Sequence, residues 1–96
     1  MPDLLSADDI KNHLGALPGW HLEKGEITRT IELASFPAAV LFVGAVGHIA
    51  EAAGHHPDIV IKYRKVTLSL VSHDAGGLTE ADFSLATRID HLIQGA

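Results

Sequence analysis

Histidines gather in two short segments of this 96-residue chain, and both segments are rich in glycine or proline. One reads Glu51-Ala-Ala-Gly-His-His-Pro57, and the other reads Ser72-His-Asp-Ala-Gly-Gly-Leu-Thr79. Loops held by rigid elements commonly carry binding and catalytic residues. Imidazole titrates at a pH of about 6.5 when unperturbed, and in its neutral form it donates from one nitrogen and accepts at the other. Histidines that converge could therefore take a proton from one ligand atom and return one to another.

The two neighbouring histidines are expected to have different roles. His55 and His56 follow Gly54, a natural helix terminator, and Pro57 disfavours helical backbone at His56. Adjacent residues of extended chain point to roughly opposite sides. Glu51 precedes His55 by one helical turn, so it could orient an imidazole, bind a polar edge of a ligand, or be a solvated helix residue.

Other site chemistries fit the sequence less well. His55, His56, His73 and Asp74 could supply metal ligands, but adjacent residues of extended chain rarely chelate one ion, so no metal and no other cofactor is predicted. The histidine pair could instead cap backbone carbonyls. The sequence has no cysteine, no Gly-x-Ser-x-Gly elbow and no dinucleotide-type glycine loop. We interpret the histidines at positions 13, 21, 48 and 91 as surface residues.

Charge and composition exclude several classes of protein. Seven Lys and Arg side chains against twelve Asp and Glu side chains give a net charge of −5, so no nucleic-acid partner is predicted. The dense basic cluster at positions 62, 64 and 65 suits a solvated strand edge and turn better than an anion site. A length of 96 residues indicates a single domain, 1–96, with a modest core, for which an oligomer would bury extra surface.

Residues 33–47 carry no charge, which is the one membrane-like feature of the chain. The stretch is interrupted by Pro37, Gly44 and Gly47 and falls short of the about 20 apolar residues that a span needs. We therefore expect a helix buried on nearly every side, with something packed closely against its glycines. With no signal peptide at the N-terminus, the expectation is a soluble, cytoplasmic protein without a membrane contact.

Periodicity and capping residues predict seven elements. They are a helix from Ser6 to about Gly15, strands over 20–24 and 26–33, a helix from Ser35 to about Gly54, strands over 58–63 and 66–72, and a helix from Thr79. Two hairpins separated by a helix favour an α+β, two-layer fold, in which a four-stranded antiparallel sheet carries three helices on one face in the order α-β-β-α-β-β-α.

The apolar spacing of the helices predicts which faces they bury. In the middle helix we expect one stripe of Val40, Val43, Gly47 and Ala50, which is widened by residues 36, 42, 46 and 49. In the last helix the stripe is formed by residues 83, 86, 89 and 93, and Thr79 with Asp82 resembles a capping box.

The combined pattern resembles the pterin-4a-carbinolamine dehydratases over essentially the whole chain from about residue 5. His-His-Pro57 is followed, seventeen residues after His56, by His73-Asp-x-Gly-Gly-Leu-Thr, and Tyr63, the Val66-x-Leu-x-Leu70 strand and Gly19-Trp20 also match. The resemblance implies dehydration of 4a-hydroxytetrahydrobiopterin to quinonoid dihydropterin, without a metal or an organic cofactor. It implies a dimer or tetramer that recycles tetrahydropterin after an aromatic amino acid hydroxylase has used it.

Site residues follow from the resemblance position by position. His55, His56 and His73 match the family's catalytic histidines. Glu51 matches a site acid, Trp20 a site aromatic and Asp82 a residue at the pocket rim, and Pro57 and Asp74 belong to the matched motifs. We expect His56 or His73 to act on the hydroxyl and His55 on the ring-nitrogen side. Gly54 and Ala81 depart from residues that some members carry there.

The runner-up function is a non-enzymatic, oligomeric protein-interaction module, similar to a transcriptional coactivator. The nearly uncharged helix over 35–50 supports contact with a partner through a helix face, and packing of a homo-oligomer explains it equally well. A metal-dependent hydrolase lacks a convincing ligand set. Decay of 4a-hydroxytetrahydropterin with and without the protein separates enzyme from module.

Overall fold

The computed structural model describes residues 3–95 and contains three helices and one four-stranded sheet. In chain order the elements are α1 (Ala7–Gly15), β1 (His21–Glu23), β2 (Glu26–Glu32), α2 (Phe36–Ala53), β3 (Asp58–Lys62), β4 (Lys65–Leu70) and α3 (Glu80–Gln94). The predicted α-β-β-α-β-β-α order and α+β class are confirmed. The strands differ from the predicted ranges by one or two residues at their ends.

The helices begin where capping side chains satisfy free backbone N–H groups. Ser6 accepts a hydrogen bond from the Asp9 N–H, and Ser35 accepts one from the Ala38 N–H. At α3 the predicted capping box is present, because Thr79 caps the helix and Asp82 reaches back to the Thr79 N–H.

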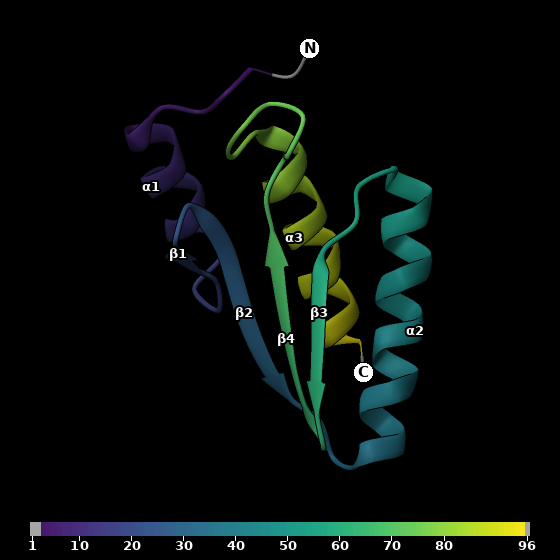
Figure 1. Cartoon of the computed structure of the whole chain (residues 1–96). Helices are drawn as coiled ribbons and strands as arrows, with labels where there is room; N and C mark the ends of the chain where they lie inside the picture. The colour runs from purple at the N-terminus through teal and green to yellow at the C-terminus, as the bar shows by residue number, and fades with distance from the viewer. Residues whose placement is uncertain (1–2, 96) are drawn as a thin grey trace.

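The sheet is antiparallel throughout, with the strand order β1-β2-β4-β3. Figure 1 shows α3 behind the sheet, α2 beside β3, and α1 near the opposite edge. Pairing of Ile31 with Val66 fixes a register in which alternate residues of β2 and β4 face the helices. The other sheet face carries hydroxyl pairs, such as Thr30 with Thr67 at 2.9 Å.

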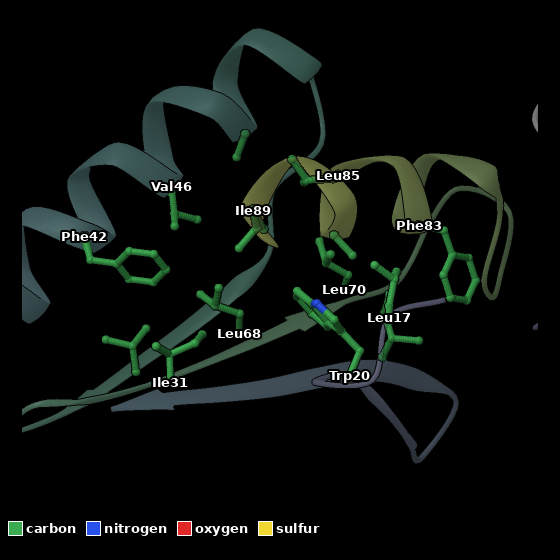
Figure 2. Packing of buried hydrophobic residues seen from close by; sticks show 14 of the residues in the cluster. Leu17, Trp20, Ile31, Phe42, Val46, Leu68, Leu70, Phe83, Leu85 and Ile89 are labelled. Carbon is green, nitrogen blue, oxygen red and sulfur yellow. The ribbon is translucent and has the colours of Figure 1, made fainter. Parts of the chain in front are cut away.

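Side chains from the sheet, α2 and α3 form the core. Figure 2 shows Phe42 and Val46 of α2 pointing toward Ile89 of α3, with Leu68 of the sheet beneath them. All four are buried. The core therefore joins the second hairpin to the two longer helices, and these are the elements that carry the histidine segments.

The prediction that α2 is buried on nearly every side is wrong, although three of the predicted positions, Phe42, Val46 and Ala50, are buried. Its buried stripe is Ala39, Phe42, Val46 and Ala50, and Val40 from the predicted stripe is 45 % exposed. The outer side of the helix is solvent-facing, and Leu41 is 76 % exposed. The cause is geometric, since α2 covers the sheet with one side, and a helix that is apolar all round gives no sequence signal for which side that is.

The glycines of α2 are not closely packed within the chain, contrary to expectation. A Cβ added to Gly44 or Gly47 would meet no heavy atom within 4 Å among the described residues. By length and composition alone α2 could cross a membrane. Its buried stripe packs into the core of the sheet, as expected of a helix in a folded domain.

Candidate active site

Three structural devices bring the histidine segments together. Gly54 ends α2 in the left-handed conformation (φ 66°), and the His55 N–H donates to the Ala50 carbonyl, so the chain turns out of the helix at the first histidine. The chain then enters β3 at Asp58. On the other segment, Ser72 and Gly77 pair backbone to backbone and close a loop that carries His73 and Asp74.

These devices produce one pocket of about 360 Å³, named here the histidine pocket. Its lining residues are Ala53, Gly54, His55, His56, Val71, Ser72, His73, Asp74 and Ala81. The three histidines that the sequence singled out therefore meet in one hollow, although they come from two separate segments. The volume is within the range of small-molecule sites.

Asp82 lies beneath His55, and its geometry differs from the expected rim position. Its side chain is fully buried, and its Oδ1 accepts a hydrogen bond of 2.6 Å from the His55 Nε2–H. Its Oδ2 accepts from the Ser72 hydroxyl and the Thr79 N–H, both at 2.9 Å. The rim prediction is wrong because Asp82 is the third residue of α3 and reaches back into the capping box.

This arrangement assigns the hydrogens at His55. A carboxylate only accepts hydrogen bonds, so the Asp82 contact requires a hydrogen on Nε2 of His55. The Nδ1 atom of the neutral ring then has a free lone pair, which can accept a proton or a hydrogen bond from a ligand. The ring is held in a pocket wall with its side chain 18 % exposed.

The second histidine has a different partner, as the extended-chain argument predicted. His56 Nε2 lies 2.7 Å from Glu51 Oε1, and both side chains are largely exposed. Glu51 therefore contacts His56 rather than His55, the residue one turn away. His73 and Asp74 are exposed on the loop. The pocket thus combines one fixed imidazole with two solvent-accessible ones.

Four of the five predicted binding residues, Glu51, Trp20, Pro57 and Asp82, lie outside the lining of the histidine pocket. Trp20 is buried in the hydrophobic core, where its Nε1–H donates to Asp90 Oδ1 at 2.8 Å, and Figure 2 shows its ring among core residues. Pro57 is half-buried just after His56. Trp20 therefore packs in the hydrophobic core and does not line the pocket.

Sequence reasoning assigned no role to Ser72, which is buried and bonded to both Asp82 and Thr79. The signal was in the strand pattern. Positions 66, 68 and 70 face the core, and position 72 continues that alternation with a hydroxyl residue. A hydroxyl directed into a core needs a buried partner. Across residues 3–95 no three His, Asp or Glu side chains group as a possible metal site.

The chain is similar in sequence to a family of known proteins. The family model described as pterin 4 alpha carbinolamine dehydratase matches residues 3–92. A Roseiflexus sp. (strain RS-1) protein named as a pterin-4-alpha-carbinolamine dehydratase is 56 % identical over 93 residues, which cover 97 % of this chain and 100 % of the relative. An Acidobacterium capsulatum protein with the same name is 52 % identical over 93 % of this chain and 97 % of its own.

A solved structure is similar over nearly the full length. The Brucella melitensis protein described as a transcriptional coactivator/pterin dehydratase has a TM-score of 0.88 and 28 % identity, covering 93 % of this chain and 97 % of that one. A pterin dehydratase-like protein described as a RuBisCO assembly factor shares the fold, with a TM-score of 0.62, 23 % identity and coverage of 76 % and 84 %. The chain belongs to the pterin-4a-carbinolamine dehydratase family, whose members are hydro-lyases.

Proposed function

We propose that the chain dehydrates 4a-hydroxytetrahydrobiopterin, or a related 4a-hydroxytetrahydropterin, to the quinonoid dihydropterin by histidine acid–base catalysis. The observation that carries the proposal is the convergence of His55, His56 and His73 on one pocket. The buried Asp82 adds to it, because it fixes the tautomer of one of the three rings.

The reaction needs one base and one acid. A proton leaves N5 of the pterin, the electron pair of that N–H bond forms the C4a=N5 double bond, and the C4a–O bond breaks. The departing hydroxyl takes up a proton and leaves as water. In our proposal Nδ1 of His55 accepts the N5 proton, and His56 or His73 protonates the hydroxyl. Solvent can reset the protons on these last two residues, because both are exposed.

The remaining predicted residues take supporting roles in this proposal. Glu51 orients His56, and Asp82 positions His55. Asp74 lines the pocket, where its carboxylate can accept hydrogen bonds from the amino and ring N–H groups of a pterin. Pro57 stiffens the backbone after His56. Trp20 supports the site through the core.

Single substitutions test the proposal. We expect His55→Ala, His56→Ala and His73→Ala each to slow enzyme-dependent decay of 4a-hydroxytetrahydropterin, by about 10²-fold where acid–base catalysis is lost. Stopped-flow absorbance across a range of pH measures it. His21→Ala removes an exposed imidazole from β1 and serves as the matched control. Unchanged turnover in all three variants would reject histidine catalysis.

We also propose that the chain works as a homodimer or homotetramer. The support is a set of exposed apolar side chains, Phe36 and Leu41 of α2 and Val60 and Tyr63 at β3. Beside α2 lies an apolar hollow of about 700 Å³. The strand β3 is an open sheet edge, and an antiparallel edge can pair with its own copy across a two-fold axis.

In the cell, the substrate class suggests a cytoplasmic role in recycling tetrahydropterin beside an aromatic amino acid hydroxylase. A second candidate function, a protein-interaction module, is favoured by the same exposed face of α2 and by the coactivator description of the Brucella melitensis protein. The decay assay separates the two, because a module without catalysis leaves the rate at the uncatalysed value.

A further inference from the structure

A second hollow, of about 270 Å³, adjoins the histidine pocket. We name it the Arg88 hollow, and its lining residues are Ala53, His55, Ala81, Ser84, Leu85 and Arg88. Three of these, Ala53, His55 and Ala81, also line the histidine pocket. A ligand beside His55 can therefore extend into the Arg88 hollow without leaving the protein surface.

Arg88 is an uncompensated cation in an acidic chain. It is exposed, and within residues 3–95 it forms no ion pair. The acidic residues of its own helix are engaged elsewhere, each with a different partner. These contacts are Glu80 with His13 at 3.0 Å, Asp82 with His55 at 2.6 Å and Asp90 with Arg29 at 2.8 Å.

The chemistry of the hollow suits an anionic group. A guanidinium presents a planar fork of N–H donors that matches a phosphate or a carboxylate. The Ser84 hydroxyl lines the same hollow and can add a neutral donor. With a net charge of −5, the chain as a whole repels anions, so a local cation is needed to hold one at this place.

The substrate's own connectivity relates this hollow to the reaction. In a pterin, C6 is bonded directly to N5, and C6 carries the side chain that distinguishes one pterin from another. If His55 acts on N5, the C6 side chain starts one bond from that atom, on the wall that both hollows share.

We propose that the Arg88 hollow binds an anionic group, a phosphate or a carboxylate, on the C6 side chain of the pterin. Arg88 is then a specificity-determining residue, and the preferred substrates are pterins with an acidic side chain rather than the neutral dihydroxypropyl chain of biopterin. The inference rests on the proposed dehydratase function, because it uses His55 as the group that faces N5.

A pair of ligands that differ only in the anion tests it. Neopterin and neopterin 3′-monophosphate share ring and side chain, and their binding is followed by pterin fluorescence. We expect the native protein to bind the monophosphate about tenfold or more tightly than neopterin, a preference that weakens with added salt. Arg88→Gln should abolish the preference while affinity for neopterin changes less than about twofold, and Arg88→Lys should keep part of it.

Arg64→Gln is the matched control, because it removes the same charge from the β3–β4 turn, where Arg64 pairs with Glu32 at 2.9 Å. It should leave the preference intact. Equal affinity for both ligands in the native protein, or a preference that survives Arg88→Gln, overturns the Arg88 subsite. If the native protein still binds neopterin, the proposed dehydratase function is not affected by that result. If the native protein binds neither ligand and does not turn over 4a-hydroxytetrahydropterin, the proposed function is overturned as well.

Discussion

At the scale of single residues, Asp82 decides what His55 can do. Its two carboxylate oxygens face different groups, Oδ1 the imidazole and Oδ2 the Ser72 hydroxyl and Thr79 N–H. One side chain thus caps α3 and fixes the His55 tautomer. Local stability and proton chemistry therefore depend on the same buried group.

Asp82→Asn should separate these two roles. The amide oxygen can still accept from Thr79 and Ser72, so the free energy of unfolding should change by about 1 kcal/mol or less. The amide NH2 then donates to His55 Nε2, which moves the ring hydrogen to Nδ1 and removes the proposed base. We expect turnover to fall by about 10²-fold or more.

The tautomer gives a readout that a purely structural role would not move. The ¹⁵N chemical shifts of the His55 ring report which nitrogen carries the hydrogen, and they should exchange in Asp82→Asn. Asp74→Asn, which changes an exposed carboxylate of the same pocket, should leave these shifts as they are. A native tautomer with native turnover in Asp82→Asn would contradict the assignment.

The sequence predicts a site residue more easily when its signal is local than when it depends on a contact with a residue far along the chain. His55, His56 and His73 were found because histidines beside glycine and proline carry a local signal. The contact of His55 with Asp82 spans 27 positions, and it depends on how α3 docks, which no local pattern encodes. The sequence therefore predicts the pocket histidines better than their hydrogen-bond partners.

At the scale of elements, helix starts were predictable, and strand ends were less so. Ser6, Ser35 and Thr79 each cap a helix through a side-chain contact within three residues, so the signal is local. The exposed side of α2 was not predictable, because this helix carries apolar side chains on all of its sides. Its orientation is decided by the sheet and by whatever covers its outer side.

In the segment between α1 and β1, Gly19 lies close to the guanidinium of Arg29. A Cβ on Gly19 would lie 2.5 Å from Cζ and Nη1 of Arg29. The guanidinium would have to move, and it now donates to Asp90 Oδ1 at 2.8 Å, the atom that also accepts from Trp20. Gly19→Ala should therefore lower the free energy of unfolding by about 1–3 kcal/mol through loss of this charged hydrogen bond.

Urea unfolding followed by Trp20 fluorescence measures the Gly19 effect. Gly15→Ala is the matched control, because a Cβ at Gly15 meets nothing within 4 Å and the residue lies in the last turn of α1. That variant should be neutral or slightly stabilising. Equal stability of the two variants would show that Arg29 can move away at no cost.

At the scale of the whole molecule, the site and the apolar surface use different parts of the same framework. The histidine pocket forms where α2 ends, β4 ends and α3 begins. The 700 Å³ hollow lies toward the other ends of these helices, lined by Leu41 and Phe42 of α2 and by Leu92 and Ile93 of α3. Changes to the outer side of α2 can therefore test assembly without touching the histidines.

Leu41→Glu is the sharpest such change, because Leu41 is 76 % exposed and does not belong to the hydrophobic core. If a second copy covers α2, the buried charge should cost several kcal/mol and reduce the native mass to that of a smaller assembly or a monomer. Light scattering coupled to size exclusion measures the mass. Leu22→Glu, on β1 at the opposite sheet edge, is the control and should keep the native mass. A native protein that is monomeric at tens of micromolar would overturn the proposed assembly. An assembly that survives Leu41→Glu would show that α2 is not its interface, and the open β3 edge would then be the surface to substitute.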